Sequence, residues 1–227
     1  QLDRIFDISL PPHHFIIDCI SKFARLLERT HIVSDKETER SVFYNGYWLD
    51  KKYWKDVDLR ELFLFRKPTL SVEAEEYLNK IKSCNAVSVH IRRGDYLSRD
   101  NLKKFGIFCT EHYYQLAIER ITQEQPDTCF FVFSDDIPWV QKNMCIPNAH
   151  FVDCHHGDDS WKDLFLMSCC KHNIIANSTF SFWAAMLNPN PNKIVFYPQR
   201  WFYWETPDIF PDSWISINTE EVERKYL

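Results

Sequence analysis

The chain has 227 residues, of which 45% are hydrophobic and 26% are charged, and its formal net charge is −5 at pH 7. These values are typical of a globular protein and argue against a binder of nucleic-acid polymers that relies on a broad basic surface. No window approaches 18 consecutive apolar residues, so the sequence predicts no membrane span.

The first part of the chain, residues 1–83, is expected to be the remaining part of a mostly helical N-terminal domain. Apolar residues at helical spacing predict an amphipathic helix over 15–27. An aromatic stretch follows at 42–54, and a charged helix is expected over 72–81, after the break at Lys67-Pro68. Asp56 and Asp58 have the Asp-x-Asp spacing of some metal sites, but they lie in a charged stretch rather than after an apolar strand. We therefore expect no metal there.

From Cys84 onward, short apolar runs alternate with amphipathic segments. Strands are expected over 86–91, 129–133, 150–152, 173–176 and 193–197, with helices between them over 110–122, 138–144, 160–170 and 180–187. Thr110 is a suitable N-cap for the first of these helices. Strands that alternate with helices imply right-handed crossovers and a parallel, Rossmann-like sheet. The sequence therefore predicts an α/β fold, with a Rossmann-like domain at 84–227.

Polar clusters follow three of the predicted strands, and they consist of Arg92-Arg93-Gly94-Asp95, Ser134-Asp135-Asp136 and Asn177-Ser178-Thr179. Ligands of open α/β sheets sit beyond the carboxyl ends of the strands. Guanidinium groups are costly to bury without an anionic partner, and their fork suits phosphate geometry. The second and third clusters are also ordinary helix N-caps, and the third offers a helix N-terminus that attracts phosphate. Together the clusters favour a site for a diphosphate.

Two blocks of the sequence carry a family resemblance. The run His90-Ile91-Arg92-Arg93-Gly94-Asp95-Tyr96 resembles the signature of the α-1,2-fucosyltransferases, which form glycosyltransferase family 11. The segment 163–185, with Asn177-Ser178-Thr179-Phe180-Ser181 at its centre, resembles the second long signature of the same family. The resemblance covers most of residues 84–200, and residues 47–65 are similar to the segment that precedes them in the family.

This resemblance implies a GT-B-like fold whose C-terminal Rossmann-like domain binds GDP-fucose. The implied reaction is inverting and metal-independent transfer of L-fucose from GDP-β-L-fucose to the 2-hydroxyl of a terminal β-galactoside, which forms an α-1,2 linkage. GDP-fucose is then a co-substrate, and we expect no cofactor and no metal. Two alternatives stay open: a remnant that binds nucleotide or glycan without turnover, and a related fucosyltransferase with a different acceptor.

The resemblance also implies roles for individual residues. Arg92 or Arg93 holds the diphosphate leaving group, while His90 approaches the ribose or guanine together with an acid after the second strand. Asp95 either takes part in catalysis or, as we favour, orients the arginines. The candidate catalytic residues are Arg92, Arg93 and Asp95. The candidate donor-binding residues are His90, Arg92, Arg93, Ser134, Asp135, Asp136, Asn177, Ser178, Thr179 and Phe180.

One family segment has no counterpart in this sequence. A glycine-rich run resembling Gly-Gly-x-Gly-Asn-Gln opens the family's N-terminal half, whereas this chain contains only 4 Gly. The acceptor site and the base that deprotonates the acceptor hydroxyl are therefore not assigned from the sequence.

Two further patterns complete the sequence-based expectations. The 8 Cys are irregularly spaced and several lie in apolar runs, so we expect free thiols in a reducing compartment. A cytoplasmic location follows from this, with a Golgi anchor in a preceding segment as the alternative. In the run 155–159, two adjacent His rarely converge on one ion, so we expect a solvated turn there. The oligomeric state is not indicated.

Overall fold

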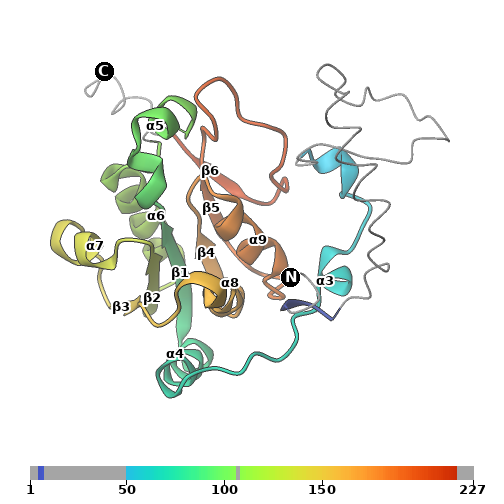
Figure 1. Ribbon diagram of the computed structural model, residues 1–227, viewed down its shortest axis with the longest axis vertical. Coiled ribbons are helices and arrows are strands. Elements are labelled where there is room, and N and C mark those ends of the chain that lie inside the picture. The colour runs from blue at the N-terminus through green and yellow to red at the C-terminus, as the bar shows by residue number, and fades with distance from the viewer. Residues whose placement is uncertain (1–4, 8–49, 106–107, 219–227) are drawn as a thin grey trace.

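A six-stranded parallel sheet forms the centre of the computed structural model, which describes residues 5–7, 50–105 and 108–218 (Figure 1). The strands are β1 (Asn85–Ile91), β2 (Thr128–Ser134), β3 (Ala149–Val152), β4 (His172–Ile174), β5 (Val195–Pro198) and β6 (Ile215–Ile217). Their order is β3-β2-β1-β4-β5-β6, and every neighbouring pair runs parallel. This is the strand order of the Rossmann fold, so the predicted Rossmann-like sheet is confirmed.

Helices connect these strands, and two of the described α-helices precede the first strand in the chain. The α-helices are α3 (Leu59–Leu62), α4 (Val72–Ser83), α5 (Arg99–Phe105), α6 (Glu111–Glu124), α7 (Ile137–Asn143), α8 (Trp161–Ser168) and α9 (Thr179–Leu187). Short 3-10 helices are η1 (Lys51–Tyr53), η2 (Gly94–Leu97) and η3 (Gly157–Asp159). The predicted cap of α6 is confirmed, because the Thr110 hydroxyl accepts a hydrogen bond from the backbone N–H of Tyr113.

Helices cover both faces of the sheet, which is why its central strands are almost continuously apolar (Figure 1). Val87 and Val89 of β1 pack with α6 and α7 on one face. On the other face, Ala86 and Phe131 pack with α4, α8 and α9. Alternate residues of β1 therefore point to opposite layers, and His90 lies on the same face as Ala86.

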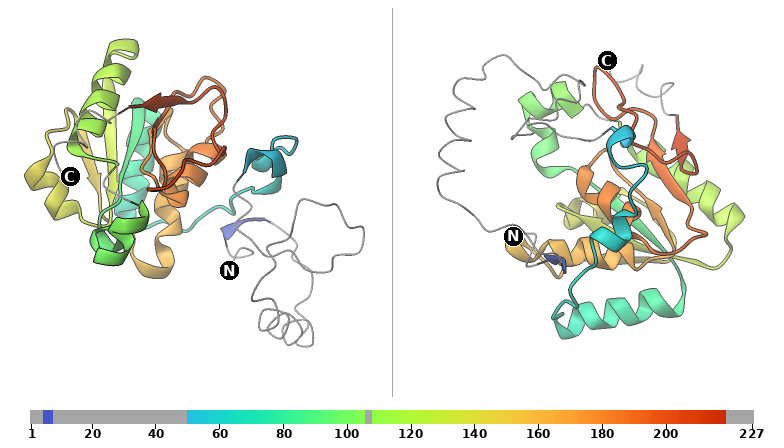
Figure 2. Two further views of the ribbon diagram at one scale, coloured as in Figure 1. Left: turned by 90° about the horizontal axis from the view of Figure 1, so that it is seen from above. Right: turned by 90° about the vertical axis from the view of Figure 1, so that its right-hand side faces the viewer.

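The connection between β5 and β6 forms a third apolar cluster against α9 (Figure 2). Trp201, Phe210 and Trp214 surround Phe182 of α9 with ring-centroid distances of 6.3, 6.2 and 5.5 Å. These aromatic contacts hold the long connection against α9.

Several sequence predictions for the first part of the chain have different outcomes. The helix at 15–27 and the aromatic run at 42–48 lie outside the described residues. The helix at 72–81 is α4, which packs against the sheet through Leu78 and Ile81. The boundary between domains at 83 and 84 stays a prediction. Asp58 caps α3, where it accepts hydrogen bonds from the backbone and the guanidinium of Arg60.

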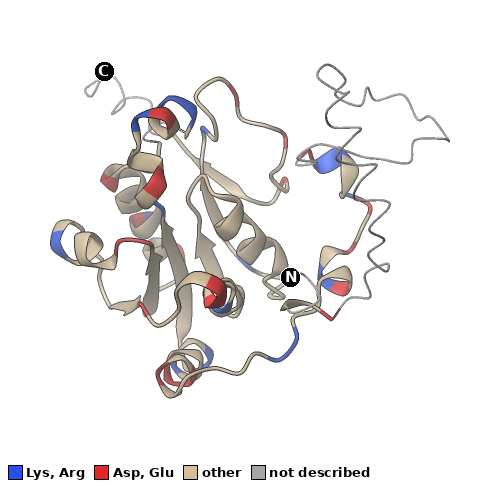
Figure 3. Cartoon of the chain, in the orientation of Figure 1, with Lys and Arg blue, Asp and Glu red and all other residues tan. Residues whose placement is uncertain are grey.

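Charged residues of both signs are scattered over the described helices (Figure 3). Among the described residues, no helix is both long enough and apolar enough to cross a membrane. The seven described cysteines are free thiols, as expected, and Cys19 lies outside the described residues.

Buried and exposed thiols are expected to differ sharply in reactivity. Burial raises the pKa of Cys109 to about 12 and places the pKa of Cys170 well above its ordinary value, whereas Cys145 is exposed. Alkylation at pH 8 followed by peptide mass mapping should label Cys145 before Cys109 and should label the buried Cys170 only after unfolding, because the thiolate is the reactive form. Equal labelling rates at Cys170 and Cys145 in the folded protein would contradict the buried placement.

Candidate active site

The site lies at the carboxyl edge of the sheet, between β1 and β4. These strands are neighbours, but the chain continues from β1 toward β2 and from β4 toward β5, in opposite directions across the sheet. Such a switch point opens a crevice for ligands in α/β sheets. Residues 92–96 follow β1 and residues 175–179 follow β4, so the structure brings the first and third predicted clusters to one edge. The Tyr96 hydroxyl joins them by donating to the carbonyl of Asn177 at 3.0 Å.

Two consecutive tyrosines of α6 hold the ends of both strands. The Tyr113 hydroxyl donates to the carbonyl of Ile175 at 2.6 Å, and the Tyr114 hydroxyl donates to that of His90 at 2.9 Å. Burial raises the pKa of both phenols well above its usual value, so they remain donors. Both tyrosines fall in the helix predicted at 110–122, and the sequence-based prediction assigned them no role at the site. The signal it missed is that a buried phenol requires a hydrogen-bond partner.

Arg92 is held between two carboxylates. Its Nη2 lies 2.7 Å from Asp95 Oδ1 and its Nη1 lies 3.0 Å from Asp135 Oδ2. Asp95 thus binds the guanidinium, as the orienting interpretation expects. A guanidinium has five N–H groups, so these two ion pairs leave donors for a further ligand. In the described chain, the anionic partners of Arg92 are therefore supplied by the protein itself.

Arg93 is fixed in a different way. Its guanidinium carbon lies 3.3 Å from the centroid of the Trp139 ring, and its Nε lies 3.5 Å from Asp136 Oδ2. Stacking on an indole restricts the plane of the guanidinium and leaves its edge free to donate. Trp139 was not predicted to belong to the site, because it lies inside α7 and nothing in the sequence relates it to β1.

The three residues of the cluster after β2 have two kinds of contact, with the start of α7 and with the segment that holds the two arginines. The Asp136 carboxylate accepts from the backbone N–H of Trp139 at 3.2 Å, so Asp136 is the N-cap of α7. Ser134 Oγ accepts from the N–H of Asp136 at 3.0 Å. The alternative of an ordinary helix cap therefore describes Asp136, which also pairs with Arg93, while Ser134 stabilises the turn before α7. Asp135 instead accepts from the backbone N–H of Arg93 at 2.9 Å and joins the segments after β1 and β2.

His90 carries an unpartnered polar atom in the interior. Its side chain is almost fully buried, and among the described residues its Nδ1 is the one buried side-chain nitrogen or oxygen without a hydrogen-bond partner. The ring lies 5.6 Å from that of Phe180, in the first turn of α9. Burial, with a smaller contribution from Arg92, lowers the pKa of His90 to about 3, so the ring is neutral. An unsatisfied buried group costs about 1–3 kcal/mol, and in a native structure it calls for an explanation such as a catalytic role or a bound water or ion.

The residues after β4 present the N-terminus of α9. Ser178 is the N-cap residue but makes no side-chain capping hydrogen bond, so the first N–H groups of the helix are available. Thr179 is exposed and Phe180 is half-buried. Asn177 faces inward, because its Nδ2 donates to the carbonyls of Phe105 and Trp201, each at 3.0 Å. Its side chain therefore holds the surrounding loops, and its role in donor binding stays a prediction.

The expectation of a solvated turn over 155–159 is wrong for one residue. His156 and the 3-10 helix η3 are exposed, as expected. His155, by contrast, is buried, and its Nδ1 lies 2.6 Å from Asp163 Oδ1. The partner lies in α8, in a part of the sequence that the prediction did not consider.

Residues 23–218 match the family model described as Glycosyl transferase family 11. The chain belongs to glycosyl transferase family 11. The predicted family is thereby confirmed, and the glycosyltransferase family supplies a chemical context for an anion site at the switch point of the sheet.

Named relatives of this family 11 glycosyltransferase come from bacteria and primates. It is 34% identical to an alpha-1,2-colitosyltransferase of Escherichia coli over 217 residues, which are 90% of this chain and 75% of the relative. It is 37% identical to the O-antigen biosynthesis glycosyltransferase WbnK of Escherichia coli over 186 residues, or 76% of this chain and 61% of the relative. A galactoside alpha-(1,2)-fucosyltransferase 1 of Ateles belzebuth is 32% identical over 103 residues, 44% of this chain and 28% of that protein.

Proposed function

We propose that this family 11 chain transfers L-fucose from GDP-β-L-fucose to the 2-hydroxyl of a terminal β-galactoside, with inversion and without a metal ion. The observation that carries the proposal is the unpartnered, buried Nδ1 of His90 at the switch point of the sheet. It lies between the arginine pair after β1 and the first turn of α9, which are two structures suited to a diphosphate.

The proposed chemistry concerns the leaving group. As the bond from the fucosyl carbon to GDP breaks, negative charge develops on the diphosphate. The N–H groups of Arg92 and Arg93 that no aspartate occupies, with those of the first turn of α9, would stabilise that charge. Donors that are already oriented lower the barrier because they need no reorganisation during the reaction.

The aspartates at the site act as positioning residues in this proposal. Asp95 and Asp135 bind the two terminal nitrogens of the Arg92 guanidinium and so restrict its side chain. Less side-chain entropy is therefore lost when the donor binds. Asp136 similarly holds Arg93 against Trp139. Neither arrangement requires a carboxylate to contact the substrate.

The proposal is tested by incubating the protein, in a version that includes all residues of its natural chain, with GDP-fucose and lactose. The expected product is 2′-fucosyllactose, identified by mass and by its α-anomeric NMR signal, with the same yield in EDTA as in magnesium. Calorimetric titration with GDP is run in parallel. GDP binding without fucosyl product would instead support a remnant that binds nucleotide, and absence of both would overturn the proposal.

A second candidate is transfer of a colitosyl group in place of the fucosyl group. It is favoured by the 34% identity to an alpha-1,2-colitosyltransferase over 90% of this chain. Parallel assays with the two GDP-sugars on one galactoside acceptor separate the candidates, because the donor with the larger kcat/KM is the natural one. An acceptor panel of galactosides, N-acetylglucosamine glycans and peptides tests the alternative of a different acceptor.

Replacing Gly94 by alanine is expected to lower fucosyl transfer by about 10²-fold, because a small displacement of a positioned group can cost that much. A Cβ at residue 94 would overlap the carboxylate of Asp135, which is fixed by both Arg92 and the backbone of Arg93. Unfolding in urea should change by only about 1 kcal/mol. Ser98→Ala, in the same exposed segment, is the control, and an unaltered rate in Gly94→Ala would contradict the role of Asp135.

A further inference from the structure

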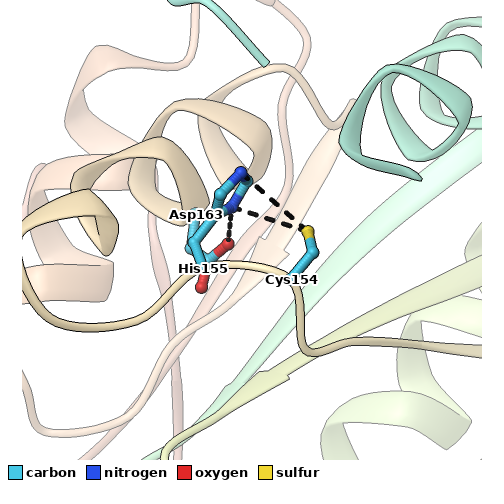
Figure 4. Close-up of side chains that lie close together, drawn as sticks. All are labelled: Cys154, His155 and Asp163. Atoms are coloured by element: carbon cyan, nitrogen blue, oxygen red, sulfur yellow. Dashed lines mark hydrogen bonds and ion pairs between the residues drawn. The ribbon is translucent and has the colours of Figure 1, made fainter. Parts of the chain in front are cut away.

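Three side chains of different chemistry converge beyond the end of β3 (Figure 4). Cys154 and His155 follow β3, and Asp163 lies in the first turn of α8. One ligand atom from each lies within 4.8 Å of the others. The side chains of His155 and Asp163 are only 4% and 16% exposed, so the group is largely shielded from water.

The distances in this group are close to those of a tetrahedral metal site. Zinc bonds of about 2.3 Å to sulfur and about 2.0 Å to nitrogen place these atoms about 3.6 Å apart. Cys154 Sγ lies 3.6 Å from His155 Nδ1. The corresponding nitrogen-to-oxygen separation is about 3.3 Å, whereas His155 Nδ1 and Asp163 Oδ1 are 2.6 Å apart. An ion would therefore open this hydrogen bond by about 0.7 Å. Cys154 Sγ lies 3.6 Å from Nδ1 and 4.0 Å from Nε2, which is beside the ring, so the imidazole would also turn to direct Nδ1 toward an ion shared with the sulfur.

A cysteine nucleophile of the Cys-His-Asp type does not fit the same geometry. Such a triad places the nucleophile and the acid at opposite nitrogens of the imidazole. Here Asp163 lies at Nδ1, and Cys154 Sγ is also closer to Nδ1, at 3.6 Å, than to Nε2, at 4.0 Å. Sulfur at these two distances lies beside the ring and not in line with Nε2, so the three side chains do not form such a triad.

The environment of the carboxylate favours a cation. The Asp163 side chain is only 16% exposed, and a buried carboxylate is costly unless a positive charge or hydrogen bonds compensate it. Thiolate and imidazole ligands select zinc and related divalent transition ions, while calcium and magnesium prefer oxygen ligands alone.

We propose that Cys154, His155 and Asp163 bind one divalent ion of the zinc class, with water in the fourth position. On binding, the thiol and Nδ1 release their protons to solvent and Nε2 takes one up, so that the neutral imidazole coordinates through Nδ1. The ion would fasten the segment after β3 to α8. Cys154 and His155 follow β3, whereas the arginines follow β1, and β2 lies between these two strands.

The proposal is tested by titrating the chelator-treated protein with Co²⁺. We expect one equivalent to produce a thiolate-to-cobalt charge-transfer band, Zn²⁺ to displace it, and Zn²⁺ to raise the Tm. Cys154→Ser should abolish the band, and Asp163→Asn, which keeps a hydrogen-bonding group beside His155, should weaken binding at least about tenfold. Cys145→Ser, which removes an exposed thiol elsewhere, is the matched control and should keep the band.

Absence of the band in the wild-type protein would overturn the proposal and leave a hydrogen-bonded His155–Asp163 pair alone. A band that persists unchanged in folded Cys154→Ser would also overturn it. Far-UV circular dichroism of each variant establishes that it is folded, and the wild-type result decides the question even if a variant fails to fold.

Discussion

Replacing Arg93 by alanine is expected to lower kcat/KM for GDP-fucose by about 10²- to 10³-fold, the usual effect of losing one donor to a developing negative charge. The side chain is held in one plane by the Trp139 ring at 3.3 Å and by Asp136 at 3.5 Å. Its free edge therefore needs no reorganisation to bind a diphosphate. Initial rates with varied GDP-fucose, at saturating galactoside, measure the effect.

One further variant separates charge from geometry at this position, and a second variant elsewhere in the protein is the control. Arg93→Lys keeps the positive charge but loses the planar fork, so it should recover only part of the rate. Arg120→Ala removes an arginine of α6 that is paired with Glu124, outside the candidate site, and should leave the rate unchanged. Wild-type kinetics in both Arg93→Ala and Arg92→Ala would refute the role of the arginine pair in holding the leaving group.

Acidification is expected to destabilise the protein through His90. Burial lowers the pKa of His90 from 6.5 to about 3. Above pH 6.5 the ring is neutral in both folded and unfolded states, so it contributes no pH dependence. Between pH 6.5 and about 3 only the unfolded state binds the proton, so the free energy of unfolding falls by about 1.4 kcal/mol per pH unit, up to about 5 kcal/mol.

The comparison of wild-type protein with His90→Phe isolates this effect. Urea unfolding from pH 8 to pH 4 should show a shallower loss of stability in the variant. Some pH dependence should remain, because burial also lowers the pKa of His172. At pH 7 the variant should be at least as stable as the wild type, since it lacks the unpartnered Nδ1, while its affinity for GDP falls. His156→Gln removes an exposed histidine as a control, and equal slopes for wild type and His90→Phe would contradict the burial argument.

Most of the sheet could be predicted because its central strands β1, β2 and β4 are largely buried, and β1 and β2 therefore read as short apolar runs. β6 was missed, since Ile215–Ile217 is a three-residue edge strand after a long irregular connection. The order of the strands was not predicted either, because pairing joins segments far apart in the sequence. That order decides which polar clusters share the switch point.

The candidate site was predicted in its location but not in its internal contacts. The motif at 90–96 and the cluster at 177–179 could be recognised because parallel strands align their carboxyl ends. The partners of Arg92 and Arg93 could not, since Asp95, Asp135 and Trp139 are selected by the three-dimensional course of two loops. The same reason explains the His155–Asp163 pair.

The hydrogen bonds of Asn177 have a consequence for how members of this family can diverge. Its side-chain Nδ2 donates to the backbone carbonyls of Phe105 and Trp201, and its backbone carbonyl accepts from the Tyr96 hydroxyl. Because backbone oxygens are the same for every amino acid, the side chains on both loops can change without loss of these contacts. The sequences of the loops around the candidate site can therefore change while the course of the backbone there is kept.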